Sequence, residues 1–184
     1  MKTIYPHKIT VNQKLELKNL FVDFRRCTGC RDCEAACREE NGLGPDYNWI
    51  NVIQVGPREV EGRRETDNIP IFCRNCEQAP CVTACPKKAI TRMSNGNVLI
   101  NPDICIGCMS CAEVCPFGAI ALDSRRRVAT LCTLCRQLTE AGEEPACLQA
   151  CPAKCIYYGE INQIMNQIRK QAASHLVKES VDDC

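Results

Sequence analysis

The chain has 184 residues, of which 18 are cysteine, and its aromatic residues are four Phe, four Tyr and one Trp. The 23 basic and 22 acidic residues give a formal net charge of +1 without a long basic tract, which argues against a general nucleic-acid-binding protein. No apolar run approaches the roughly 20 residues that a membrane-spanning helix needs. The aromatic content is low for an ordinary core, so something other than side chains must help to fill the interior.

The first half of the chain contains two strand signals. Residues 20–24 predict a strand that leads into the first cysteine-rich segment, and residues 49–53 predict another. The second strand lies in a 35-residue insertion between cysteine-rich segments, where the polar stretch from Pro57 to Asn68 is expected to form an exposed loop. Trp49 is interpreted as a packing anchor rather than an electron-tunnelling relay, because large aromatic side chains are usually buried.

Two β-hairpins and a helix are expected further along the chain. Residues 91–100 predict a hairpin because Asn95-Gly96 separates two short β-prone runs. Residues 119–130 predict a second hairpin around the polar stretch 123–127. After Gly159, residues 160–178 predict an amphipathic helix.

The expected helix has one apolar face and one polar face. The apolar stripe contains Ile161, Ile164, Met165, Ile168, Ala172 and Leu176. The face expected to meet water carries Asn162, Gln163, Asn166, Arg169, Lys170 and Gln171. Two interpretations stay open: the stripe packs on the chain's own body, or it clamps a partner subunit or a second copy of the chain.

Sixteen of the cysteines fall into four groups of four. These tetrads are Cys27, Cys30, Cys33 and Cys37; Cys73, Cys76, Cys81 and Cys85; Cys105, Cys108, Cys111 and Cys115; and Cys132, Cys135, Cys147 and Cys151. A proline follows the last three of them directly. The first and third have the C-x2-C-x2-C-x3-C spacing of bacterial ferredoxins, in which the fourth cysteine ligates a different cluster.

Three explanations exist for so many cysteines, and the spacing discriminates between them. A disulfide scaffold belongs mostly to small secreted domains, and the chain shows no signal peptide. Structural zinc sites use pairs of ligands separated by a longer stretch, so three closely spaced cysteines leave one ligand too many on the loop. The spacing therefore favours iron–sulfur clusters.

The tetrads also define an internal repeat. Aligning the segments after Cys85, Cys115 and Cys151 puts Cys155 where the other two repeats have alanine, so Cys155 is interpreted as a small buried residue. Cys184, the last residue, is expected to lie in a terminal tail as a free thiol.

Candidates for other chemistry are scarce. His7 and His175 both lie far from the cysteine segments, and the sequence has no phosphate-binding glycine loop, dinucleotide fingerprint or nucleophile elbow. We therefore predict no catalytic residues on this chain, and clusters that carry electrons only.

The four tetrads in this order, with the long gap between Cys135 and Cys147, resemble the four-cluster iron–sulfur electron-transfer subunits of the dimethyl sulfoxide reductase type. Relatives of that family serve formate dehydrogenases, hydrogenases, carbon monoxide dehydrogenases and tungsten aldehyde oxidoreductases. The resemblance covers about residues 20–158. It implies an α+β, loop-rich fold of two ferredoxin-like dicluster halves with short hairpins and helices. The expected domains are residues 1–158, with an inner half of about 69–131 and an outer half of about 20–68 plus 132–158, and residues 159–184 as the C-terminal helix and tail.

The resemblance implies nested halves, and the fourth cysteine of each tetrad is expected to point away from its own loop. Together these two features predict which cysteines share a 4Fe–4S cluster. The four predicted ligand sets are Cys73, Cys76, Cys81 with Cys115; Cys105, Cys108, Cys111 with Cys85; Cys27, Cys30, Cys33 with Cys151; and Cys132, Cys135, Cys147 with Cys37.

The leading functional hypothesis is an electron-transfer subunit. Its expected partners are a larger molybdenum, tungsten or nickel enzyme and a second electron carrier, with no nucleic acid and no membrane span of its own. A cytoplasmic location is expected because neither an export signal nor a membrane helix is visible. The alternatives are a free soluble polyferredoxin and, from another class, a cluster-based redox sensor, which the absence of a recognition motif disfavours.

Four complete tetrads predict about sixteen iron atoms and about sixteen acid-labile sulfides per chain, as four cubes require. Anaerobic purification followed by iron and sulfide analysis measures this. About eight of each per chain, or zinc in place of iron, would contradict the assignment.

Overall fold

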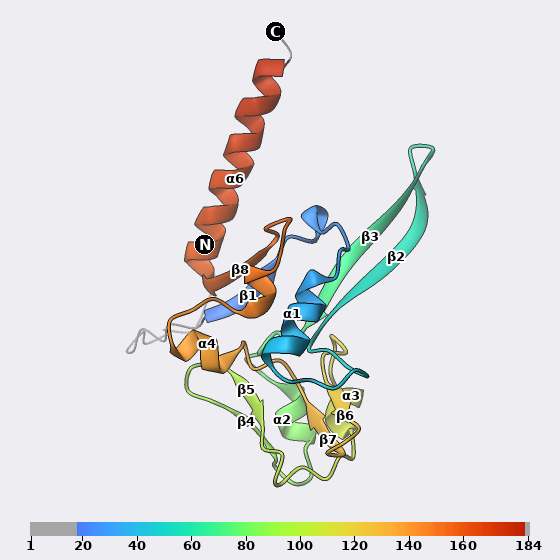
Figure 1. The fold of residues 1–184 in the computed structure, drawn as a ribbon, viewed down its shortest axis with the longest axis vertical. Helices are drawn as coiled ribbons and strands as arrows, with labels where there is room; N and C mark the ends of the chain where they lie inside the picture. Colours follow the sequence, from blue (N-terminus) through green and yellow to red (C-terminus); the bar gives the residue numbers. More distant parts are fainter. Residues whose placement is uncertain (1–17, 183–184) are drawn as a thin grey trace, which may run out of the picture.

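Four separate two-stranded antiparallel sheets, linked by short helices, make up a small mixed fold (Figure 1). The computed structural model describes residues 18–182, so Cys184 lies outside the described part. In chain order the elements are β1 (Lys18–Val22), the 3-10 turn η1 (Phe24–Arg26), α1 (Asp32–Glu40), β2 (Ile50–Val60), β3 (Arg63–Phe72), α2 (Pro80–Ala84), β4 (Ile90–Arg92), β5 (Val98–Ile100), α3 (Ser110–Glu113), β6 (Ala121–Asp123), β7 (Val128–Thr130), α4 (Arg136–Glu140), α5 (Ala146–Gln149), β8 (Ile156–Glu160) and α6 (Ile161–Asp182).

The first and last strands pair with each other. β1 runs antiparallel to β8 with Leu20 opposite Tyr158, so segments from the two ends of the described chain lie side by side. The expected strand at 20–24 begins two residues earlier and ends at Val22, after which Phe24–Arg26 form a 3-10 turn. This sheet brings the first cysteine segment next to the last one.

Both expected hairpins are confirmed. β4 pairs with β5 across the Asn95-Gly96 turn, where Gly96 has a φ of +85° and the amide of Met93 donates to the carbonyl of Asn97 at 2.8 Å. β6 pairs with β7 around a turn in which the Asp123 carboxylate accepts from the amides of Arg125 and Arg126. Such local side-chain bonds are the usual chemistry of an Asx turn.

The insertion forms a long two-stranded ribbon, so the prediction of a loop from Pro57 to Asn68 was wrong. β2 and β3 pair along most of their length, and the turn residues Glu61 and Gly62 both have positive φ, as a tight hairpin turn requires (Figure 1). The outer part of the ribbon is largely exposed, as expected. At its base the amide of Val52 donates to the Glu34 carboxylate at 2.6 Å, which ties the ribbon to α1.

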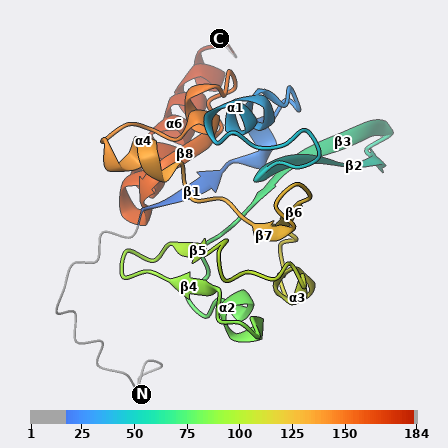
Figure 2. The ribbon, with the colours of Figure 1, turned by 60° about the horizontal axis from the view of Figure 1, so that its bottom comes forward.

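Two hydrophobic cores form, and cysteines belong to both. The first core combines residues of β1, β2, β3 and β8, among them Leu20, Ile50, Phe72 and Ile156. The second combines Ile90, Val98 and Leu131 with their neighbours. Figure 2 shows α2, α3 and the two short hairpins on one side of the fold, and β1, β8, α1, α4 and α6 on the other. The sulfur-bearing loops therefore lie within and between two small cores.

The C-terminal helix α6 is present, and its packed face agrees with the predicted stripe in part, since Met165 and Ile168 are half-buried. Ile164 is buried, whereas Ile161 and Ala172 are exposed. Gln171, assigned to the water-facing side, instead accepts hydrogen bonds from Arg26 and from the hydroxyl of Tyr157. The helix continues to Asp182 and projects beyond the body (Figure 1). Within residues 18–182, no helix has the length and apolarity needed to cross a bilayer.

Replacing Ile164 with alanine is expected to lower the free energy of unfolding by about 2–5 kcal/mol, because a side chain that is 2% exposed leaves a cavity under α6. The matched control is Ile161→Ala in the same helix, where the side chain is 59% exposed and the change should stay within about 0.5 kcal/mol. Anaerobic guanidinium denaturation followed by circular dichroism compares them. Equal effects of the two substitutions would show that α6 does not pack through Ile164.

Candidate iron–sulfur sites

Each tetrad places its third cysteine in a short helix. Cys33 lies in α1, Cys81 in α2, Cys111 in α3 and Cys147 in α5, and the fourth cysteine follows four residues later. Only α1 also contains its fourth cysteine, Cys37; Cys85, Cys115 and Cys151 lie just beyond the ends of α2, α3 and α5. In those three tetrads the chain has left the helix by the fourth cysteine, so that sulfur is free to face a different space from the third.

The loops before α1 and α3 share one backbone pattern. Gly29 and Gly107 have φ values of +76° and +66°, and Arg31 and Met109, two residues later, also have positive φ. These left-handed residues curl the loop so that successive cysteines face inward. At Gly107 the bend brings the backbone against the carbonyl oxygen of Arg127, which would lie 2.2 Å from a Cβ atom.

Three cavities are each lined by four cysteines that combine three from one tetrad with the fourth from another. The lining sets are Cys73, Cys76, Cys81 and Cys115; Cys105, Cys108, Cys111 and Cys85; and Cys27, Cys30, Cys33 and Cys151. The three cavities are small and similar to one another in size. Cys155 also lines the last one.

The remaining four cysteines, Cys37, Cys132, Cys135 and Cys147, are all buried in the first core region. Burial raises the pKa of Cys147 strongly, and the neighbouring sulfurs of Cys135 and Cys37 raise that pKa further. The side-chain amide of Asn41 lies 3.8 Å from the sulfur of Cys37 and 3.6 Å from that of Cys135. These four sulfurs therefore form a fourth group, and each sequence-predicted set is brought together.

Burial disfavours the thiolate form in every group. It raises the pKa of Cys37, in the fourth group, to about 11, and in the other three groups it raises the pKa of Cys33 to about 12 and the pKa of Cys73 and Cys111 to about 11 each. Since metal ligands are thiolates, a group bound here must bring enough positive charge to displace the protons. Iron atoms at four corners supply that charge, and four sulfurs per group supply one ligand for each corner. The donor sets therefore fit cubic iron–sulfur clusters.

Within the described part of the chain, no set of three or more His, Cys, Asp or Glu side chains is close enough to hold one metal ion. The cysteine side chains instead line the three cavities described above.

Backbone amides donate to several of the sulfurs. The amide of Ala89 lies 3.2 Å from the sulfur of Cys85, and that of Ala119 lies 3.4 Å from the sulfur of Cys115, at equivalent positions of two repeats. Ala129 in β7 donates in the same way to Cys105. Hydrogen bonds to ligand sulfurs are one of the factors that set cluster reduction potentials.

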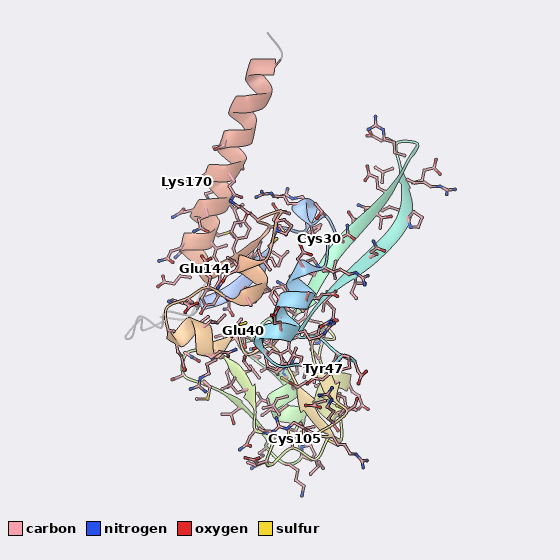
Figure 3. All side chains as sticks on the ribbon, in the orientation of Figure 1. Cys30, Glu40, Tyr47, Cys105, Glu144 and Lys170 are labelled. Carbon is pink, nitrogen blue, oxygen red and sulfur yellow. The ribbon has the colours of Figure 1, made fainter. Side chains whose placement is uncertain are left out.

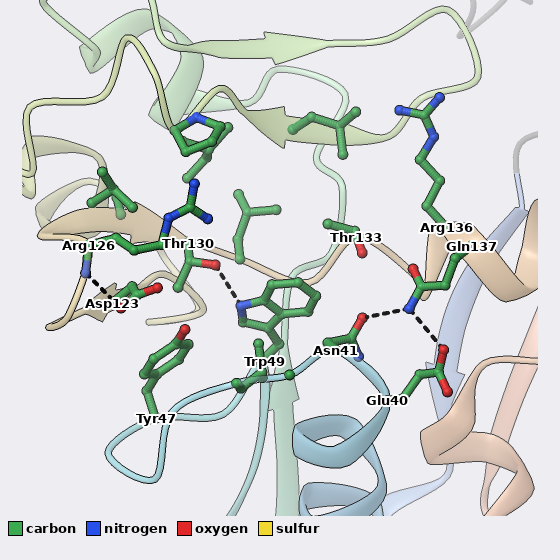
Figure 4. A pocket seen from close by; sticks show the side chains of 18 residues that line it. Glu40, Asn41, Tyr47, Trp49, Asp123, Arg126, Thr130, Thr133, Arg136 and Gln137 are labelled. Carbon is green, nitrogen blue, oxygen red and sulfur yellow. Dashed lines mark hydrogen bonds between the residues drawn. The ribbon is translucent and has the colours of Figure 1, made fainter.

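A separate cavity of about 560 Å³, larger than the three cysteine-lined cavities, lies between the second core and α1 with its following loop (Figure 4). Across it, the indole N–H of Trp49 donates to the Thr130 hydroxyl at 2.8 Å. Gln137 donates to Glu40 and to Asn41, which joins α4 to the end of α1. Trp49 also packs against the first core, so its role as a packing anchor agrees with these contacts.

Asn41 is the residue near the sulfurs that the sequence analysis missed. It follows Cys37 by four residues, so the helical spacing of α1 carries its amide back over the Cys37 carbonyl and sulfur. That spacing was readable in the sequence. The contact to Cys135, which is 94 residues away, was not.

Two family models match the chain, and both are described as a 4Fe–4S dicluster domain. One covers residues 26–89 and the other residues 65–161. Each such domain holds two clusters, so the two matches correspond to four 4Fe–4S clusters. This chain therefore belongs to the 4Fe–4S dicluster family of electron-transferring iron–sulfur proteins.

Several known proteins are similar over most of the sequence. The B subunit of polysulfide reductase from Wolinella succinogenes is 34% identical, and the match covers 83% of this protein and 81% of the relative. The B subunit of anaerobic dimethyl sulfoxide reductase from Escherichia coli K12 is 30% identical over 78% of this protein and 74% of its own length. An uncharacterized ferredoxin of Methanocaldococcus jannaschii is 34% identical over 90% of this protein and 86% of its own length.

The close approach at Gly107 predicts the effect of adding one methyl group there. Gly107→Ala is expected to remove the cluster of the Cys105 loop, about four of sixteen irons, because the methyl would collide with a backbone carbonyl that cannot swing away. Gly42→Ala is the control, since Gly42 has a φ of +58° but no neighbouring atom within 4 Å among the described residues.

Iron analysis of the two anaerobically purified variants distinguishes the collision from backbone strain alone. A full iron content in Gly107→Ala, or an equal loss in Gly42→Ala, would contradict the collision.

Proposed function

We propose that the chain relays single electrons through four 4Fe–4S clusters in line, between the catalytic subunit of a molybdenum, tungsten or nickel oxidoreductase and a second redox partner. The observation that carries this proposal is the composition of the four sulfur groups, each of which joins three cysteines of one tetrad to the fourth of another. The sixteen tetrad cysteines are the proposed ligands, in the sets given above. A cluster bound in each group would supply one reversible electron-carrying site.

The order of the four sulfur groups along the proposed relay follows from which cysteines of different groups lie near one another. The sulfurs near Cys132 include Cys73, and those near Cys147 include Cys33. The Cys132 group therefore lies between the Cys73 group and the Cys27 group. Residues of the Cys73 and Cys105 groups share the second core, so the Cys105 group continues the line at the other end.

The two terminal groups are the ones that contain an exposed cysteine. Cys30 and Cys108 are exposed, whereas all four cysteines of the Cys132 group are buried. Cys30 and Cys105 lie at opposite ends of the cysteine-bearing body (Figure 3). We infer that electrons enter at one of these ends and leave at the other.

The exposed end around Cys108 has an apolar rim. Ile106, between two of the proposed ligands and in the lining of their cavity, is 58% exposed, and Ile104 beside Cys105 is also exposed. Clusters of exposed apolar side chains mark interaction sites. We propose that this rim meets a redox subunit, in keeping with the names of the reductase subunits to which the protein is similar.

A free soluble ferredoxin is the second candidate, favoured by the similarity to the Methanocaldococcus ferredoxin. Purification of a tagged chain from its native cells under anaerobic conditions discriminates between the two. A larger redox subunit in equal amount supports the subunit, and a brown monomer supports the free carrier. The cytoplasmic location and the nested halves expected from the sequence are part of the same proposal.

The proposed ligand sets predict which substitutions affect the same cluster. Cys85→Ala and Cys111→Ala should remove the same electron paramagnetic resonance signal from the reduced protein, because their sulfurs line one cavity. Cys81→Ala and Cys115→Ala should both remove a different signal, because theirs line another. If Cys85→Ala instead matched Cys81→Ala, each tetrad would serve a single cluster and the crossed assignment would be refuted.

A further inference from the structure

Cys155 is the one described cysteine outside the tetrads, and it occupies a distinctive repeat position. Four residues after the closing cysteine, the second and third tetrads have Ala89 and Ala119, whereas the fourth has Cys155. All three residues are buried. A small apolar residue satisfies the packing at this position, so packing alone does not require a thiol in the third instance.

The backbone holds Cys155 in place. Its carbonyl accepts from the amide of Asp23 at 2.9 Å, which joins it to the segment after β1, and β8 begins at the next residue. The residue is 2% exposed. Its sulfur is therefore located by the same sheet that brings the two ends of the described chain together.

The Cys155 sulfur faces one of the proposed cluster cavities. It lines the cavity formed by Cys27, Cys30, Cys33 and Cys151, which makes five cysteines around this cavity. It lies 3.5 Å from the sulfur of Cys151, well beyond the 2.03–2.05 Å of a disulfide bond. The two sulfurs are thus separate thiol groups beside one another at one corner of the cavity.

We propose that Cys155 is a reserve ligand for the iron corner assigned to Cys151, an inference that rests on the proposed cluster ligation. A ligand exchange at this corner needs a sulfur displacement no larger than the 3.5 Å between the two atoms. The iron–sulfur bond to Cys151 breaks and a bond to Cys155 forms. The proton leaving the Cys155 thiol is taken up by the Cys151 thiolate or, where that sulfur has been lost, by water. Iron and sulfur keep their oxidation states throughout.

The reserve ligand serves one end of the proposed relay. The same cavity includes Cys30, which is exposed, so this group is open to oxidants in the surrounding water. A second sulfur at the Cys151 corner would keep the cluster complete after damage to Cys151. The groups closed by Cys85 and Cys115 have alanine at the equivalent position and lack this reserve.

The test compares single and double substitutions in the anaerobically purified full-length chain. Cys151→Ala and Cys155→Ala should each keep about sixteen irons per chain, whereas the double variant should lose between about one and four irons. Loss of one corner iron would also appear as a three-iron signal in electron paramagnetic resonance of the oxidised protein. The matched control is Cys115→Ala, which should lose iron as a single substitution because Ala119 offers no sulfur.

The second measurement introduces a reserve cysteine after another tetrad. It tests the proposal even if the Cys151→Ala variant fails to fold. Adding Ala119→Cys to Cys115→Ala should restore the lost irons if a thiol four residues after the closing cysteine is sufficient. The proposal is overturned if Cys151→Ala loses as much iron as the double variant, or if the transplant restores nothing. An iron-free wild-type chain would instead refute the proposed clusters themselves, so the two failures are distinguishable.

Discussion

The fold depends on one geometric constraint, which is that the fourth cysteine of each tetrad crosses to the sulfur group of another tetrad. α1 packs on α5 and α2 packs on α3, so the helices of the first and fourth tetrads face each other, as do those of the second and third. The third cysteine of each tetrad lies in its helix, and the fourth, at or just beyond the helix end in three of the tetrads, reaches the sulfur group of the facing tetrad. The β1–β8 pairing follows from this arrangement, since the outermost tetrads can share sulfur groups only if the ends of the described chain meet.

The same constraint explains the composition. The apolar cores are small, and buried cysteines complete both of them. Buried thiols with raised pKa values are stable as neutral groups in the chain alone, and they become ligands when iron displaces their protons. Binding of the proposed clusters would therefore be coupled to folding, and the free energy of coordination would compensate for the low aromatic content of the sequence.

Local chemistry made several features predictable from the sequence. The tetrads were recognisable because ligand spacing is a local property, and the hairpin at Asn95-Gly96 because its turn needs positive φ. The β2–β3 ribbon was missed because its turn is Glu61-Gly62 and its outer strands are polar on both faces, so no alternation of apolar and polar residues marked them. Helical periodicity predicted α6 and part of its packed face, including Ile164, but not the inward position of Gln171, which accepts hydrogen bonds from Arg26 and Tyr157 through contacts made only in three dimensions. The same holds for the sulfurs of Cys151 and Cys155: the burial of Cys155 was predicted, but the 3.5 Å separation of the two sulfurs is a contact that only the folded chain reveals.

The most direct test of the crossed arrangement is anomalous diffraction at the iron edge from anaerobically grown crystals of the chain. The account predicts four iron centres in one line, each bounded by three cysteines of one tetrad and the fourth of another, with the end centres nearest Cys30 and Cys108. Two or fewer iron centres, or four centres each bounded by the cysteines of a single tetrad, would contradict it.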